Sequence, residues 1–159
     1  VLSLDNTNSA IPFGLSLKYT SASPDSTGSY FIEAADSTTS RFRVQSDGDV
    51  LNHDNSYGAL SDARLKQDVV LSGSQWSDVK QLGALVKKFR FKSDVAANSD
   101  AKPLLGWVAQ DVQSVSPGLV QESEDGMLSV QYSIAYMKAF KALGEALERI
   151  ERLEAQLAA

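Results

Sequence analysis

Residues 133–157 form the longest periodic segment of the chain and constrain its fold more than any other part. Apolar side chains recur there in steps of four and three, the heptad spacing of a coiled coil, at Tyr136, Phe140, Leu143, Leu147 and Ile150. The pattern then slips by one position to Leu153 and Leu157, so packing is expected to loosen toward the C-terminus. So narrow a stripe favours a partner helix, although one amphipathic helix docked on its own domain gives a similar pattern.

The composition excludes several kinds of functional site. The 159 residues include no cysteine, which excludes a disulfide framework, a thiolate zinc site and a cysteine nucleophile. His53 is the only histidine, so a histidine cluster for a metal cannot form in one chain, and no cofactor is expected. The net charge of −5 argues against nucleic-acid and membrane partners, and no apolar run of about 18 residues could cross a bilayer.

Residues 1–60 are rich in Ser, Thr, Asn, Asp and Gly and carry short runs of alternating polar and apolar residues. Runs at 14–20, 28–34 and 40–52, separated by turn-forming segments, predict short strands joined by turns. Large apolar side chains are few, and a segment of this size buries too little surface to fold well as a monomer. Association with further copies of the chain is the expected remedy.

Residues 61–159 follow a different pattern. A helix is expected from about Trp76, with Ser74 or Ser77 as its N-cap, because apolar residues recur there at helical spacing. The alternating run FRFK at 89–92 predicts a strand after it.

A second strand is expected to turn at Gly106, and Pro117 is expected to end the short helix that follows. Together with the heptad helix, these elements predict an α+β chain. Its β-rich first part covers residues 1–60, and a mixed α/β domain at 61–159 ends in a coiled-coil helix over about 133–157.

Three blocks, in this order, are shared with one known family. They are SDARLKQDV at 61–69, LLGWVAQDVQSVSPGLV at 104–120, and the closing helix block LSVQYSIAYMKAFKALGEALERIERLEAQL at 128–157. This arrangement resembles the C-terminal intramolecular chaperones of phage tailspikes and tail fibres, the endosialidase-type self-cleaving serine peptidases. The upstream residues resemble the end of a fibre or spike shaft.

The resemblance implies a homotrimeric chaperone domain that folds the upstream shaft of the same chain and then cuts itself off between Leu60 and Ser61. Ser61 would be the nucleophile and Lys66 the general base of a Ser-Lys dyad. The fibre would join the virion after assembly in the host cytoplasm, and the released domain would be absent from the mature virion. The alternative is a trimerisation module that does not cleave and stays as a fibre tip or adhesin end.

The dyad makes two physical demands. A lysine in water has a pKa of about 10.4, so a lysine base must be desolvated, and Lys66 is expected to be partly buried in the cleaving assembly. Positions five apart on a helix point about 140° apart, so Ser61 and Lys66 need a bend between them or a lysine from a neighbouring chain. Asp62 and Arg64 are candidate supporting residues: Asp62 as a helix N-cap, and Arg64 as the partner of an acidic neighbour.

Three further residues have structural interpretations. His53 lies in a polar loop eight residues before Ser61, and a surface side chain is the favoured interpretation over a catalytic base. Trp107 is expected to anchor the packing of the domain. Gln110 is expected to be a buried polar group with hydrogen-bond partners.

Overall fold

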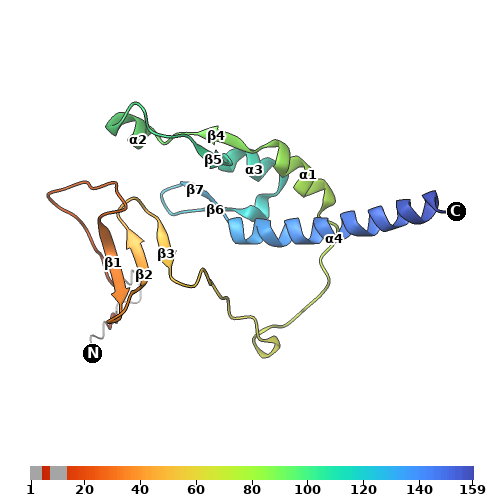
Figure 1. Ribbon diagram of the computed structural model, residues 1–159, viewed down its shortest axis with the longest axis horizontal. Coiled ribbons are helices and arrows are strands. Elements are labelled where there is room, and N and C mark those ends of the chain that lie inside the picture. Colours follow the sequence, from red (N-terminus) through yellow and green to blue (C-terminus); the bar gives the residue numbers. More distant parts are fainter. Residues whose placement is uncertain (1–4, 8–13) are drawn as a thin grey trace. The chain divides into compact units, whose positions relative to one another are not determined.

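A computed structural model describes residues 5–7 and 14–159 of the chain. The chain divides into two compact units, residues 1–68 and 69–159. The division lies eight residues beyond the domain boundary expected at Leu60 and Ser61, and the part of that first domain at residues 1–4 and 8–13 falls outside the described residues. Each unit is described separately below, and Figure 1 labels their elements.

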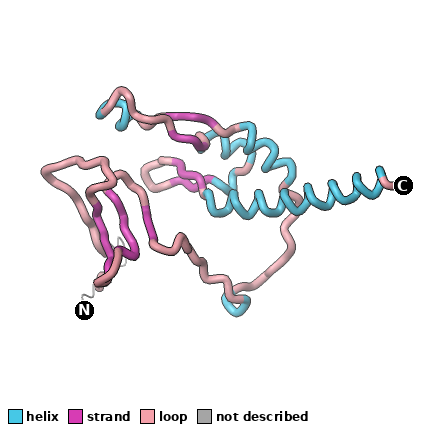
Figure 2. The backbone as a smooth tube through the Cα atoms, viewed as in Figure 1, coloured by secondary structure: helices cyan, strands magenta, loops and turns pink. Residues whose placement is uncertain are grey.

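The first unit contains one antiparallel sheet of three strands in sequence order. β1 (Tyr30–Ala35) pairs with β2 (Ser40–Gln45), and β2 pairs with β3 (Val50–Asn52). The strands predicted at 28–34 and 40–52 are therefore confirmed, and Figure 2 shows them beside one another.

Polar side chains and one glycine close the two hairpins. The Asp36 carboxylate accepts hydrogen bonds from the backbone N–H groups of Thr38 at 2.8 Å and Thr39 at 3.0 Å, which stabilises the first turn. Gly48 sits in the second turn with φ +93°, a conformation that favours glycine over residues with a Cβ.

The strand predicted at 14–20 is wrong, because these residues form no strand. Alternation of polar and apolar residues does not ensure that a partner strand is available. An isolated strand would leave its backbone N–H and C=O groups without hydrogen-bond partners. Among the described residues of this unit no apolar side chain is buried, and Gln45 is the one buried residue. The expectation of a poor monomeric core therefore holds for the described residues.

The second unit combines short strand pairs with helices. In chain order its elements are α1 (Trp76–Ala84), β4 (Lys87–Phe89), α2 (Lys92–Ala97), β5 (Leu104–Gly106), α3 (Ala109–Val115), the 3-10 helix η2 (Pro117–Leu119), β6 (Val120–Glu122), β7 (Leu128–Val130) and α4 (Tyr132–Leu157). β4 pairs with β5 and β6 with β7, both antiparallel. No helix among the described residues is long and apolar enough to cross a membrane.

The core of this unit lies where α1, α3, η2 and α4 meet. Its buried members are Leu82, Val112, Leu119 and Ala135. Trp107 packs against this cluster, donates from its indole Nε1 to the Leu82 carbonyl at 2.9 Å, and stacks on Tyr132 with ring centroids 5.4 Å apart. The packing role expected for Trp107 is therefore confirmed.

Gly106 is buried at the end of β5, where the neighbouring aromatic rings leave no room for a side chain. A Cβ there would lie 2.9 Å from the Tyr132 hydroxyl and 3.2 Å from Phe89 Cε1. The strand expected to turn at this glycine, and the helix expected to end before Pro117, are both confirmed by β5 and α3.

Three local predictions are corrected by the structure. The strand predicted at 89–92 lies two residues earlier, at Lys87–Phe89, because β4 pairs with β5 there and Lys92 already begins α2. Gln75 rather than Ser74 or Ser77 is the N-cap of α1, although Ser74 Oγ accepts from the Trp76 N–H at 3.3 Å. Gln110 is exposed rather than buried, since its position on α3 faces away from the core.

Candidate active site

Ser61 and Lys66 lie next to one another within a single chain. Lys66 Nζ donates a hydrogen bond to Ser61 Oγ at 2.7 Å. Nucleophile and base in a serine hydrolase stand within about 2.6–3.2 Å, so this separation suits proton transfer from the hydroxyl. A lysine from a neighbouring chain is not needed to bring the two atoms together.

A bend of the backbone makes this approach possible. Asp62 is extended, with φ −62° and ψ 135°, and one turn of 3-10 helix follows it as η1 (Ala63–Leu65). The backbone returns to an extended conformation at Lys66, with φ −121° and ψ 146°. The five-residue separation that would point two side chains apart on a regular helix therefore brings them together here, and Figure 2 shows η1 as a short helical piece in a long loop.

The Asp62 side chain holds this turn. Its Oδ1 accepts from the backbone N–H of Arg64 at 2.9 Å, which makes Asp62 the N-cap of η1. The Arg64 guanidinium pairs with the same carboxylate through Nε at 3.0 Å and a terminal nitrogen at 2.7 Å. The Arg64 side chain and backbone N–H hold the pKa of Asp62 below its usual range. The acidic neighbour expected for Arg64 is Asp62 itself.

The surroundings of the pair are open in the single chain. Ser61 and Lys66 are both exposed, and Leu60, whose carbonyl would be attacked, has 90% of its surface exposed. Apolar side chains close by in the sequence are exposed as well: Leu65, Val69, Val70 and Leu71. One chain therefore does not provide the burial that is expected for a lysine base.

The same described residues contain no candidate metal site. No group of His, Cys, Asp and Glu among them could hold a metal ion.

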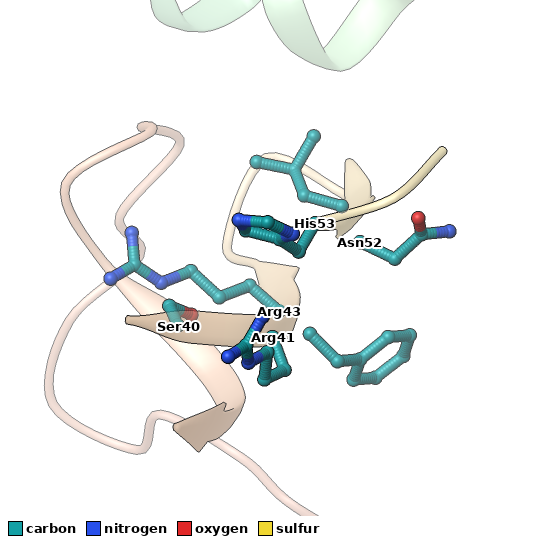
Figure 3. A pocket seen from close by; sticks show the side chains of 7 residues that line it. Ser40, Arg41, Arg43, Asn52 and His53 are labelled. Atoms are coloured by element: carbon teal, nitrogen blue, oxygen red, sulfur yellow. The ribbon is translucent and has the colours of Figure 1, made fainter. Parts of the chain in front are cut away.

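His53 lies in the turn directly after β3 and is a surface residue. Its Nδ1 is 2.5 Å from the Asp54 carboxylate, and it lines a shallow cavity of about 150 Å³ with Ser40, Arg41 and Asn52. Figure 3 shows this cavity, to which neither Ser61 nor Lys66 contributes. The two arginines that line the cavity form ion pairs with nearby carboxylates, Arg41 with Asp36 and Arg43 with Glu33.

Helix α4 presents its heptad stripe to solvent. The stripe residues have between 49% and 88% of their surface exposed: Tyr136, Phe140, Leu143, Leu147, Ile150, Leu153 and Leu157. So continuous a set of exposed apolar side chains on one helix is characteristic of a surface that packs against another protein chain.

A second face of α4 docks on its own domain. Ala135 and Ala142 are buried, and Lys138 Nζ donates to Asp78 at 2.8 Å and to Gln75 Oε1 at 2.6 Å. The two interpretations of this helix are thus compatible, because different faces of α4 carry the intradomain contacts and the exposed stripe.

The polar contacts between α1 and α4 were missed in the sequence. The Glu145 carboxylate accepts from Ser74 Oγ at 2.7 Å and from the Gln75 N–H at 3.1 Å, and the Arg149 guanidinium lies 3.9 Å from the centre of the Trp76 ring. The polar residues 138, 145 and 149 recur in steps of seven and four, which places them on one side of a helix, but this pattern does not name their partners.

Comparison with known proteins supports the resemblance seen in the sequence. Residues 61–121 match the family model described as chaperone of endosialidase. No protein of curated function matches the chain.

One similar solved structure is described as the carboxy-terminal domain of the bacteriophage T5 L-shaped tail fibre with its intramolecular chaperone domain. It is 15% identical with a TM-score of 0.46, over 77% of this chain and 44% of that one. The present chain thus spans less than half of that protein. The chain is therefore similar to the chaperone of endosialidase family over a segment that begins at Ser61 and includes Lys66.

Proposed function

We propose that this chain is the C-terminal end of a phage tail fibre or tailspike together with its intramolecular chaperone. In this proposal residues 61–159 trimerise, assist folding of the upstream shaft, and release themselves by autoproteolysis between Leu60 and Ser61. The observation that carries the proposal is the 2.7 Å contact between Lys66 Nζ and Ser61 Oγ at the first residue of the family match.

The proposed cleavage begins with transfer of the Ser61 hydroxyl proton to a neutral Lys66 amine. Ser61 Oγ attacks the carbonyl carbon of Leu60, and the lysine returns the proton to the amide nitrogen as the C–N bond breaks. An ester then joins Leu60 to Ser61 Oγ, and the Ser61 α-amine is free. Water attacks this ester, which leaves a Leu60 carboxylate and restores the serine hydroxyl. The substrate is tethered, so the fold supplies proximity and each chain reacts once.

Assembly is proposed to complete the site. A lysine acts as a base near neutral pH only where its surroundings disfavour the charged form, and exclusion of water does this. Lys66 is exposed in one chain, and the apolar side chains of Leu65, Val70 and Leu71, which are close to it in the sequence, are exposed too. Neighbouring chains that cover these side chains would remove water from Lys66, so cleavage would follow trimer formation.

The exposed stripe of α4 is the surface we propose for trimerisation. Heptad spacing brings the apolar residues of neighbouring helices into one seam, and burial stabilises the assembly by about 25 cal/mol for each Å² removed from water. Docking of another face of α4 through Ala135 and Ala142 leaves this stripe free for partners.

A removable trimerising domain suits a shaft that cannot fold well alone. The first unit buries no apolar side chain among its described residues, so its stability must come from contacts with other chains. Contacts between chains form slowly, and a domain that aligns three chains first shortens the search. After release, the shaft loses its assisted path back to the unfolded state and persists kinetically.

Intact-mass spectrometry on the freshly synthesised chain tests the proposal. The wild-type chain is expected to give two fragments that meet at Leu60 and Ser61, whereas Ser61→Ala and Lys66→Ala are expected to stay whole. Ser72→Ala is the matched control, because Ser72 is another exposed loop serine. An uncut wild-type mass from a verified trimer would instead favour the second function, a trimerisation module that stays at the fibre tip.

A further inference from the structure

We infer that Asp62 is a positioning residue for the cleavage, whose carboxylate maintains the turn that keeps Lys66 against Ser61. The inference rests on the autoproteolysis proposed above and concerns the same site. The Asp62 carboxylate accepts its hydrogen bonds from Arg64 alone and has none with the reacting atoms, so its effect passes through the backbone.

Packing does not hold the turn, because no residue of η1 is buried. Two backbone hydrogen bonds close it: Leu65 N–H to the Asp62 carbonyl at 3.0 Å and Lys66 N–H to the Ala63 carbonyl at 3.1 Å. A single helical turn with so few hydrogen bonds is unstable by itself, since nucleation fixes several dihedral angles for one bond. The Asp62 carboxylate adds three hydrogen bonds from Arg64, and these favour the bent backbone over other conformations of residues 62–66.

The distance between Ser61 Oγ and Lys66 Nζ depends on this bent conformation of the turn. Other backbone conformations between Asp62 and Lys66 would carry the Ser61 and Lys66 side chains apart, and a displacement of about 1 Å can slow a reaction by about a hundredfold. The Arg64 guanidinium is highly exposed, with 89% of its side-chain surface accessible, so the cap is expected to contribute more than the ion pair.

Four variants of the full chain separate these contributions. Asp62→Ala removes both the cap and the ion pair, Asp62→Asn keeps an oxygen that can cap, and Arg64→Ala removes the ion pair alone. Asp54→Ala is the matched control, because it deletes another exposed, paired aspartate of the same unit that lies away from the turn. Each chain is made by cell-free synthesis, and intact mass is followed over time at several pH values, with the trimer checked separately.

Asp62→Ala is expected to lower the cleavage rate about tenfold, while Asp62→Asn and Arg64→Ala stay within about threefold of wild type. Asp54→Ala is expected to match wild type, and all five chains should form trimers. If Asp62 only positions the pair, Asp62→Ala lowers the plateau of the cleavage rate in a plot of rate against pH, and the midpoint pH of that plot stays at the wild-type value. A moved midpoint with an unchanged plateau would overturn the inference, because it would show an effect of the Asp62 charge on the base.

Two further results would also overturn the inference. Cleavage of Asp62→Ala at the wild-type rate would remove any need for the carboxylate, and Asp62→Asn as slow as Asp62→Ala would rule out the cap. Both leave the proposed function standing, since the wild-type chain would still be cut. Failure of the wild-type trimer to cleave is the separate result that removes the proposed function itself.

Discussion

The junction at residues 61–66 and helix α4 differ in how many of their contacts one chain supplies. At the junction, Lys66 contacts Ser61 and Arg64 contacts Asp62, so these polar side chains find their hydrogen-bond partners close by in the sequence. Along α4, one face is docked through Ala135 and Ala142, while the apolar stripe remains exposed. The comparison teaches that the distance between Ser61 and Lys66 is a local property, whereas the dry environment that the proposed lysine base needs would come from the proposed assembly.

The largest effect is expected when the stripe is made polar. Leu143→Asp combined with Leu147→Asp places charges in the proposed seam of all three chains, where each buried leucine would contribute about 1.5–3 kcal/mol. We expect loss of the trimer and, as a consequence, loss of cleavage, measured by light scattering after gel filtration and by intact mass. Arg152→Asp, at an exposed charged position, is the control. A trimeric double variant would show that another surface assembles the chain.

Lys66→Arg is expected to abolish cleavage but leave the trimer intact. A guanidinium stays protonated in proteins and cannot accept the serine proton, although its size and charge are close to those of lysine. Intact mass and light scattering give the two readouts, with Lys88→Arg as the control at another exposed lysine. Wild-type cleavage by Lys66→Arg would exclude Lys66 as the base and sharpen the search for another.

Gly106→Ala is expected to destabilise the second unit by about 1–3 kcal/mol, because the new Cβ would press on Tyr132 and Phe89. Thermal unfolding in the Ser61→Ala background measures the change without interference from cleavage. Gly118→Ala is the control, since nothing lies within 4 Å of a Cβ built there. Equal melting temperatures for both variants would show that the rings move aside at little cost.

The smallest effect is expected for the ion pair between α1 and α4. The Lys138 ammonium lowers the pKa of Asp78, so the pair adds stability above the unfolded pKa of about 3.9, and this stability is lost as pH falls through the lower folded value. Lys138→Met should cost about 1 kcal/mol at pH 7 and less below pH 4. Urea unfolding at both pH values measures this, with Lys141→Met as the control. A difference independent of pH would assign the loss to packing.

Much of the fold could be predicted from the spacing of residues. Alternation gave β1 to β3, the heptad pattern gave α4, and Pro117 marked the end of α3. The strand expected at 14–20 failed because alternation does not reveal whether a partner strand exists. The strand expected at 89–92 was displaced because pairing with β5 selected residues 87–89 instead.

The sequence by itself determined the candidates for chemistry, Ser61 and Lys66, through the family pattern around them in a chain with no cysteine and one histidine. Only the three-dimensional structure decided that Ser61 and Lys66 meet in one chain, because their approach depends on the local dihedral angles of residues 62–66 and on the Asp62 cap, which residue spacing does not reveal. It also decided which face of α4 stays exposed. Helical spacing identifies an apolar stripe, but contacts between residues distant in sequence determine what covers it.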